Sequence, residues 1–302
     1  MTYTIRDLAR LYSEGVNINN LLRSGSYAYS EEEVIRLSYE LQAGSYIEEQ
    51  STNGLMYSKY ATEIADILIG VDPEASTILH AGCGELTSAY TLISRLKPQQ
   101  NFYAVDVSLS RLLAGRDYLR TNTSLPTQPN LVVSGLGSLP FSSNCFDVVY
   151  TSHAIEPNYN ESDIIISELA RVSCKYLVLF EPCYETATPQ MKLHMDTCSY
   201  ARNIVQSATS HGLDLLDQFF MVNPIEPLRN RTSAFVFSKS NSTLQSNAIN
   251  LTRPGTSEPL SSIEPSTFLS KGNGEIYVSV LGIPLLRSSD AITIAREDFF
   301  VC

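Results

Sequence analysis

Apolar residues near the start of the chain recur at the three- and four-residue spacing of an amphipathic helix. Val34 and Leu37 fall on one face, and Ser30 precedes an acidic residue by three positions, as in a capping box. A second run with helical spacing ends at Gly70, a residue typical of helix ends. We therefore expect a helical cap over residues 1–70.

From residue 77 the pattern changes to short apolar runs that alternate with amphipathic segments. Continuous apolar runs fit strands buried on both faces, and their regular alternation with helices favours a parallel sheet. The predicted strands are residues 77–81, 102–105, 131–133, 148–151 and 176–180, and the predicted helices are residues 88–96, 108–120, 162–172 and 189–211. Two further strands, 215–222 and 234–238, are expected to pair as an antiparallel edge. The sequence predicts an α/β fold with a doubly wound, mostly parallel sheet over residues 71–239.

The composition changes after Lys239. Residues 240–266 are rich in Ser, Thr, Asn and Pro, and such a stretch buries too little apolar surface to order itself. We interpret it as a linker. Residues 267–302 regain an alternating pattern, which predicts a small β-rich appendage that is too short to be stable alone.

The net charge of the chain argues against some classes of binding partner. The net charge is −11, and a general nucleic-acid binder needs basic surface to neutralise phosphates. No apolar run reaches the length of about 18 to 20 residues that spans a bilayer. The first residues also lack the apolar core of a signal peptide. We therefore expect a cytoplasmic protein that binds no nucleic acid and no membrane.

The cysteines give no pattern of a metal site. Tetrahedral zinc sites usually contain close C-x-x-C pairs, and this chain has none. Its six cysteines are Cys83, Cys145, Cys174, Cys183, Cys198 and Cys302. Reduced thiols and no metal are the expectation.

The strongest chemical signal is a glycine turn directly after the first predicted strand. Gly82 and Gly84 are followed by a helix, and glycine there lets a ligand approach the backbone closely. Asp106 comes 22 residues after Gly84 and closes the second strand, where a carboxylate can bind both hydroxyls of a ribose. The alternative is an ordinary turn with Asp106 as a helix N-cap. Thr87 replaces the last glycine of the G-x-G-x-x-G motif, which disfavours a dinucleotide-dependent dehydrogenase.

Two further segments, residues 139–141 (LPF) and 146–150 (FDVVY), follow Asp106 along the chain. Together with the glycine turn, Asp106 and the strand end at Glu181, they resemble the class I S-adenosylmethionine-dependent methyltransferases. The resemblance covers residues 57–239. It implies the Rossmann-like fold of that family and S-adenosylmethionine as the cofactor.

The resemblance also implies roles for individual residues. The two glycines would line the methionine part of the cofactor, Asp106 would hold the ribose and Leu136 would lie near the adenine. The residues expected to bind the cofactor are His80, Gly82, Gly84, Asp106, Leu136 and Ser152. The chain departs from the family where an acid often stands at position 80, a glycine at position 86 and an Asp at position 135. Gly135 in particular leaves the adenine amino group without its usual acid.

The acceptor side should be built at the carboxyl ends of the fourth and fifth strands, where open α/β sheets bind ligands. His153 follows the fourth strand and suits a general base, although a structural hydrogen-bonding role is an open alternative. The same holds for Glu156 and Glu181, which either orient substrate hydroxyls or cap helices, and for His194, which either faces the pocket or lies on a solvated helix face. The predicted catalytic residues are His153 and Glu156, and the predicted substrate-binding residues are Asn158, Glu181, Tyr184 and His194.

Three segments bear on the acceptor and the tail. Residues 39–46 and 153–158 resemble a bacterial subgroup associated with surface-glycan and sugar biosynthesis. Residues 152–155 (SHAI) lack the Asn-Pro-Pro-Tyr sequence of methyltransferases that act on adenine or glutamine amides. Residues 259–295 are similar to the small Trm112-like zinc-ribbon domain, but they lack its metal cysteines, so we expect a degenerate copy without zinc.

The sequence thus predicts methyl transfer to oxygen or nitrogen of a small molecule, such as a sugar or glycan precursor. The alternative is an inactive S-adenosylmethionine-binding protein that docks a partner through its tail. The expected partners are a small-molecule substrate and, in a homo-oligomer, further copies of the chain.

Overall fold

A computed structural model describes residues 3–24, 29–121, 125–198, 200–229, 231–239 and 248–295 of the chain. The helical cap begins as predicted. Capping boxes start α1 and α3, where the hydroxyls of Thr4 and Ser30 accept from the backbone amides of Asp7 and Glu33. Such caps stabilise a helix by about 1 kcal/mol. The N-terminal helices are α1 (Ile5–Ser13), α2 (Ile18–Ser24), α3 (Glu31–Leu41), α4 (Ser45–Thr52) and α5 (Gly54–Val71).

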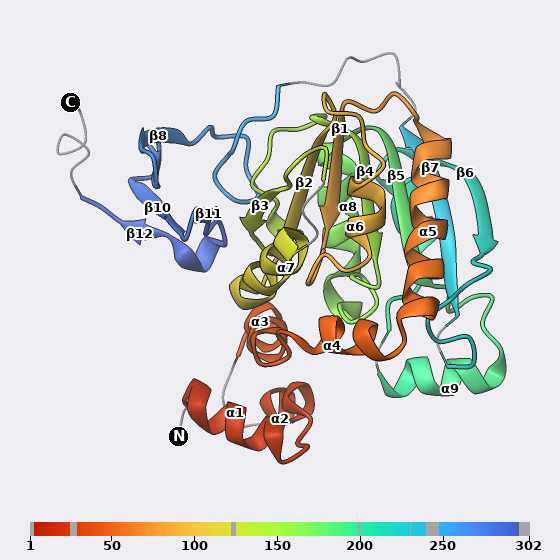
Figure 1. Cartoon of the computed structure of the whole chain (residues 1–302). Coiled ribbons are helices and arrows are strands. Elements are labelled where there is room, and N and C mark those ends of the chain that lie inside the picture. Colours follow the sequence, from red (N-terminus) through yellow and green to blue (C-terminus); the bar gives the residue numbers. More distant parts are fainter. Residues whose placement is uncertain are drawn as a thin grey trace.

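The predicted sheet is confirmed, with seven strands in the order β3-β2-β1-β4-β5-β7-β6 among the described residues (Figure 1). β1 to β5 are parallel, and β7 pairs antiparallel with both β5 and β6. The strands are β1 (Thr77–Ala81), β2 (Asn101–Asp106), β3 (Asn130–Val133), β4 (Phe146–Ser152), β5 (Ser173–Pro182), β6 (Leu213–Phe220) and β7 (Thr232–Lys239).

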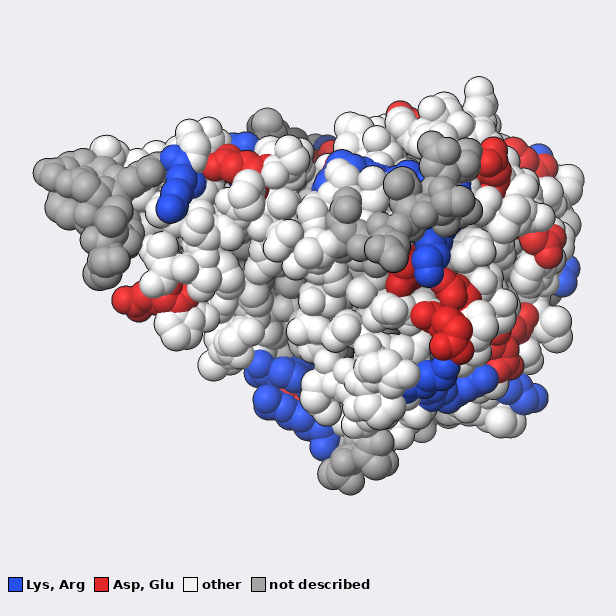
Figure 2. Space-filling model, turned by 90° about the horizontal axis from the view of Figure 1, so that it is seen from above, with Lys and Arg blue, Asp and Glu red and all other residues white. Residues whose placement is uncertain are grey.

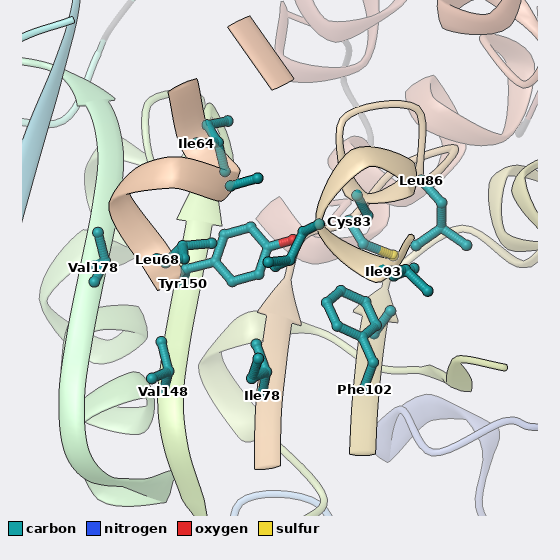
Figure 3. Packing of buried hydrophobic residues seen from close by; sticks show 14 of the residues in the cluster. Ile64, Leu68, Ile78, Cys83, Leu86, Ile93, Phe102, Val148, Tyr150 and Val178 are labelled. Atoms are coloured by element: carbon teal, nitrogen blue, oxygen red, sulfur yellow. The ribbon is translucent and has the colours of Figure 1, made fainter. Parts of the chain in front are cut away.

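Helices cover both faces of this sheet. One apolar cluster joins the sheet to α5, α6 (Ala89–Ile93) and α7 (Leu109–Thr121), and the other joins it to α8 (Ser162–Val172) and α10 (Ile204–Ser210). Figure 3 shows the first cluster, in which Ile64 and Leu68 of α5 lie against Tyr150 of β4. α5 therefore belongs to the core of the main sheet, although the sequence assigned it to the cap.

One predicted helix is wrong. The segment 189–211 forms two helices, α9 (Pro189–Thr197) and α10, instead of one. Between them Asn203 takes a left-handed conformation with φ 56°, and the amide of Ala201 donates to the carbonyl of Glu156. A continuous helix would have to give up this contact with the loop after β4.

The predicted linker is also partly wrong. Residues 240–247 lie outside the described residues, but 248–266 pack on the main domain. Leu251 forms an isolated antiparallel β-bridge with Phe141, and the amide of Thr252 donates to the carbonyl of Pro140. The segment orders because Leu251 and Leu260 pack against the second apolar cluster, which its polar composition concealed.

A small antiparallel sheet follows and continues onto the edge of the main one. The amide of Leu286 donates to the carbonyl of Val133 of β3, and Figure 1 shows these strands beside that edge. The strands are β8 (Ser261–Glu264), β9 (Thr267–Ser270), β10 (Glu275–Val280), β11 (Ile283–Pro284) and β12 (Ile292–Thr293). β8 lies within the range assigned to the linker. Three short 3-10 helices complete the described elements: Leu136–Ser138, Tyr159–Glu161 and Ser288–Asp290.

Candidate active site

A cavity of about 500 Å³ opens at the carboxyl ends of β1, β2 and β4. This volume lies in the range of small-molecule sites. The helical arm formed by α3 and α4 and the segment 225–229 complete its walls. Ten of the twelve residues that the sequence assigned to the site line this cavity, namely His80, Gly82, Gly84, Asp106, Leu136, Ser152, His153, Glu156, Asn158 and His194.

The glycine turn follows β1 as predicted. Gly82 and Gly84 have φ values of 72° and 54°, which favour glycine. A Cβ atom on Gly82 would lie 2.4 Å from the Cβ of Ala154, so no larger residue fits. Leu86 occupies the position of the family's third glycine with φ 58°, and its side chain is fully buried. The chain therefore keeps the left-handed backbone there without the glycine.

Asp106 contacts the turn directly. Its Oδ2 accepts from the amide of Gly84 at 2.8 Å, and its Oδ1 accepts from the amide of Ser108 at 2.9 Å. A carboxylate has about four acceptor positions, so two remain for a ligand. The spacing of 22 residues predicted this juxtaposition of turn and acid.

His80 lies beneath the turn with both ring nitrogens lacking a hydrogen-bond partner among the described residues. Its ring stacks on Tyr150 at 4.2 Å and is almost fully buried. Burial lowers the pKa of His80 to about 3, so the imidazole is neutral at physiological pH. The family's acid is thus replaced by an uncharged ring that can both donate and accept.

The end of the cavity beside Gly135 and Leu136 contains an acid that the sequence did not predict. Gly135 lacks the expected carboxylate, but the carboxyl group of Glu32 from α3 lies 3.1 Å from where a Cβ on Gly135 would stand. Glu32 lines the same cavity as Leu136. Burial raises the pKa of Glu32 above its ordinary value. A carboxyl group from the N-terminal arm therefore occupies the region where the family's Asp is missing.

His153 is held at both ring nitrogens. Nδ1 lies 2.7 Å from Oε2 of Glu156, and Nε2 lies 2.8 Å from the hydroxyl of Thr232 on β7. Its backbone is left-handed with φ 54°, and its amide donates to the carbonyl of Phe180. Burial lowers the pKa of His153, but the charge and hydrogen bond of Glu156 outweigh this and raise it to about 8.

The hydroxyl of Tyr60 extends this network toward the cavity. It lies 2.8 Å from the hydroxyl of Ser152, and the hydroxyl of Thr232 is near enough to affect the pKa of Tyr60. Tyr60 comes from α5 and is almost fully buried, yet it lines the cavity. The network therefore runs from the cavity wall to His153.

Glu181, which the sequence assigned to substrate binding, is not among the residues that line the cavity. It is fully buried, and its carboxylate accepts from the hydroxyl of Thr151 and from three consecutive amides, those of residues 154, 155 and 156. Burial and the charge of Glu156 raise the pKa of Glu181 to about 7. Its observed contacts organise the loop that carries His153.

Tyr184, also assigned to substrate binding, is likewise not among the residues that line the cavity. Its ring is covered by Arg202 at 4.0 Å and by Lys192 at 5.2 Å. Asn158 does line the cavity, but its side-chain amide donates to the carbonyl of Ala154 and so holds the loop. His194 faces the cavity and packs edge-on against Tyr200, 5.8 Å between ring centres.

Several lining residues escaped the sequence analysis because single positions carry no spacing signal. They come from elements far apart in the chain and are Glu32, Tyr39, Tyr46, Tyr60, Arg111, Tyr200 and Glu226. Tyr60 was predicted only as part of an apolar helix face. No signal in one sequence marks Arg111 among the residues of an amphipathic helix.

Neither a metal cluster nor a membrane-spanning helix appears in the part of the chain that the structure describes. No group of three or more His, Cys, Asp or Glu side chains could hold an ion within those residues. None of the helices within those residues combines the length and apolar character needed to cross a bilayer. Cys302 lies outside the described residues.

Comparisons with known proteins agree with the geometry of the sheet and the turn. Residues 79–175 match the family described as a methyltransferase domain. No curated protein matches the chain. Among solved structures, a chain of the complex between the Haloferax volcanii Trm112 methyltransferase activator and a methyltransferase is similar at 14% identity and a TM-score of 0.52, covering 68% of this chain and 97% of that one.

Two more solved structures are similar in outline. The magnesium protoporphyrin IX methyltransferase from Synechocystis PCC 6803 has 13% identity and a TM-score of 0.46, covering 78% of this chain and 99% of that one. A methyltransferase from Methanosarcina mazei has 15% identity and a TM-score of 0.49, covering 57% of this chain and 96% of that one. The central sheet therefore has the class I methyltransferase fold, and the match of residues 79–175 to a methyltransferase domain supports S-adenosylmethionine as the cofactor.

Proposed function

We propose that the chain transfers a methyl group from S-adenosylmethionine to a small-molecule acceptor, a sugar or glycan precursor. The observation that carries this proposal is one continuous cavity. It joins the glycine turn and Asp106 to the His153–Glu156 pair. Cofactor and acceptor would thus meet inside a single walled site, where alignment supplies much of the catalysis.

The cofactor half fits the chemistry of S-adenosylmethionine. Asp106 has acceptor positions left for ribose hydroxyls, and Glu32 supplies a carboxyl group for the adenine amino group. His80 has unpartnered nitrogens at the base of the turn, which a bound group or water would satisfy. When bound, the cofactor supplies an electrophilic methyl group.

On the acceptor side, His153 would take up the proton of an acceptor hydroxyl through Thr232 and Tyr60. The acceptor gives its proton to Tyr60, Tyr60 passes its own to Thr232, and Thr232 passes its own to Nε2 of His153. The resulting imidazolium is paired with Glu156. Burial raises the pKa of Tyr60, so its hydroxyl exchanges a proton and does not ionise.

The charge of the cavity favours a neutral or cationic acceptor. Glu49, Glu156 and Glu226 line the cavity, and Arg229 on the segment 225–229 also lines it. Fixed carboxylates repel a phosphate or carboxylate group. A neutral sugar or an amino sugar therefore fits better than a sugar phosphate or a nucleotide-activated sugar. On the face shown in Figure 2, basic side chains form small separate groups, which accords with a small-molecule substrate over a nucleic acid.

The glycan-related subgroup and the Trm112-like character of residues 259–295 remain part of this proposal. The alternative function is an inactive cofactor-binding protein that docks a partner through this tail. The observation that favours it is that both nitrogens of His153 already have partners in the chain. Against it, the tail already pairs with β3 through Leu286, so that strand edge is used within the chain.

Two measurements test the proposal in sequence. Calorimetry with S-adenosylmethionine and S-adenosylhomocysteine tests the cofactor site, and absence of binding to the folded protein would refute it. Release of S-adenosylhomocysteine is then measured with matched acceptors, a neutral sugar, its amino derivative and its phosphate. We expect turnover with one of the first two. Binding without turnover across a broad acceptor panel would favour the inactive binder.

A further inference from the structure

Arg111 is a buried cation with free donors at the cofactor end of the cavity. The residue is 3% exposed, and its Nε and Nη2 have no hydrogen-bond partner among the described residues. It lines the same cavity as Gly84 and Asp106. A buried donor without an acceptor is costly, so such groups normally have a partner in the working state of a protein.

The N-terminal arm holds the guanidinium plane without using its N–H groups. The rings of Tyr39 and Tyr46 lie 4.8 Å and 4.3 Å from its central carbon. Stacking of this kind fixes the orientation of an arginine and leaves its edge available. The guanidinium is therefore positioned in advance for a ligand at its edge.

Neighbouring carboxylates do not take up these donors. Oε1 of Glu85 is 3.7 Å from Nε, too far for a hydrogen bond, and the two oxygens of Glu85 accept from the amides of Gly44 and Ile47. Asp106 is already bonded to Gly84 and Ser108. The negative charge of both carboxylates keeps Arg111 ionised, and Glu85 lies within ion-pair distance, but Nε and Nη2 donate no hydrogen bond to either group.

The edge of Arg111 lies directly over the glycine turn. Nη2 is 2.9 Å from where a Cβ on Gly84 would stand, so the absence of a side chain at that position makes room for it. A ligand group bound to Nη2 would therefore lie beside the turn and next to Asp106. This is the region that the proposed function gives to the amino-acid part of the cofactor.

We propose that Arg111 binds the carboxylate of S-adenosylmethionine. This inference rests on the proposed function. At neutral pH the cofactor has one anionic group, its carboxylate, while its ammonium and sulfonium groups are cations that a guanidinium repels. Arginine binds carboxylates with paired N–H groups, which matches the two free donors. The helical arm that carries Tyr39 and Tyr46 thereby contributes to cofactor binding through Arg111.

The test compares ligands that differ only in this carboxylate. The probes are S-adenosylhomocysteine and its decarboxylated analogue, which keeps the nucleoside, the thioether and the amine. Calorimetry is performed with the wild type, Arg111→Met and Arg111→Lys. We expect Arg111→Met to weaken S-adenosylhomocysteine binding about 10- to 100-fold, as for loss of a charge-assisted pair, and to change the analogue less than about threefold. Arg111→Lys should recover part of the loss.

The matched control is Arg116→Met on the same helix. Arg116 donates to the carbonyl of Leu281 in the appendage and does not line the cavity, so both ligands should bind as in the wild type. Equal losses for both ligands in Arg111→Met would overturn the proposal and make Arg111 a structural support. If the Arg111 variants fail to fold, the affinities of the wild-type protein for the two ligands test the proposal. Equal affinity of the wild type for both ligands would also overturn the proposal. Failure of the wild type to bind either ligand would refute the proposed function itself.

Discussion

Nδ1 of His153 lies 2.7 Å from Oε2 of Glu156, so the imidazole after β4 is paired with a carboxylate three residues later. This pairing makes the stability of the protein depend on pH. The pKa of His153 in the folded chain is about 8, above the ordinary value of 6.5. The stabilisation is therefore complete below about pH 6.5 and is lost as the pH rises through about 8.

We expect the free energy of unfolding to fall by up to about 2 kcal/mol across this window. Glu181 acts in the same direction at lower pH, because burial raises its pKa to about 7. Urea denaturation at a series of pH values measures the change. His153→Asn is the control, because Asn tolerates the left-handed backbone and does not titrate. A variant that keeps the full decline between about pH 6.5 and pH 8 would show that His153 is not its source.

His153 should also control turnover once an acceptor is known. His153→Ala is expected to lower the single-turnover rate about 10²- to 10⁴-fold, the usual contribution of a general base. The affinity for the cofactor should change little, because the glycine turn and Asp106, which we propose hold the cofactor, are separate from His153. The wild-type rate should rise with pH toward about 8, as the imidazole loses its proton. A mutant rate within about threefold of the wild type would leave His153 as a structural residue.

Thr232 provides the matched pair for this network. Its hydroxyl is fully buried and bonded to Nε2 of His153. Thr232→Ser keeps the hydroxyl and should keep the pH dependence, whereas Thr232→Val removes it at similar volume and should lower the rate. Equal rates for the two variants would remove Thr232 from the proton path.

Asp106→Ala should weaken S-adenosylmethionine binding by about 1.5 to 3 kcal/mol, the range for hydrogen bonds to a charged group. The structure adds a second reason, because the amide of Gly84 loses its acceptor. Asp106→Asn keeps one acceptor oxygen and should lose less. Calorimetry measures both variants, with thermal unfolding to check the fold. Unchanged affinity in Asp106→Ala would contradict the assignment of the ribose site.

Helix α7 packs so tightly on the glycine turn that a methyl group does not fit at Gly115. A Cβ there would lie 2.7 Å from the backbone carbonyl carbon and oxygen of Glu85. Gly115→Ala should destabilise the protein by about 1 to 3 kcal/mol, as overpacking does. Gly70→Ala in α5 meets open space and should stabilise it by about 0.5 to 1 kcal/mol. Chemical denaturation measures the free energy of unfolding of both variants. We expect it to decrease in Gly115→Ala and to increase in Gly70→Ala.

The sequence predicted those parts of the molecule that depend on residues close to one another along the chain. The alternation of apolar runs and amphipathic segments is local, and it predicted the sheet. The spacing from Gly84 to Asp106 is set by one strand–helix–strand unit, and it predicted that both residues belong to one site; in the structure the two lie in direct contact. Leu251 lay in a polar stretch, so its packing against the main domain was not visible in composition.

The rest of the site depends on packing between distant segments. Glu32 reaches Gly135 only because α3 lies at the carboxyl ends of the strands, and Thr232 reaches His153 only because β7 lies beside β5. A lone arginine in an amphipathic helix is typical of a solvated face, yet two tyrosines of the arm bury Arg111. Contacts between segments that are far apart in the chain leave no periodic pattern in the sequence, so the sequence did not predict them.

Leu86 sets two opposing effects against each other at one position. Its left-handed backbone, φ 58°, costs a non-glycine residue about 1 to 2 kcal/mol. Its side chain is fully buried in the first apolar cluster, and truncating such a leucine to alanine costs about 2 to 5 kcal/mol. Burial outweighs strain, so Leu86→Gly should be less stable than the wild type, although the related family often has glycine there. Leu86→Ala loses the same packing but keeps the strain, so it should be less stable than Leu86→Gly by about 1 kcal/mol. Urea denaturation of the two variants gives both differences. A Leu86→Ala protein more stable than Leu86→Gly would mean that the left-handed conformation costs nothing at this turn.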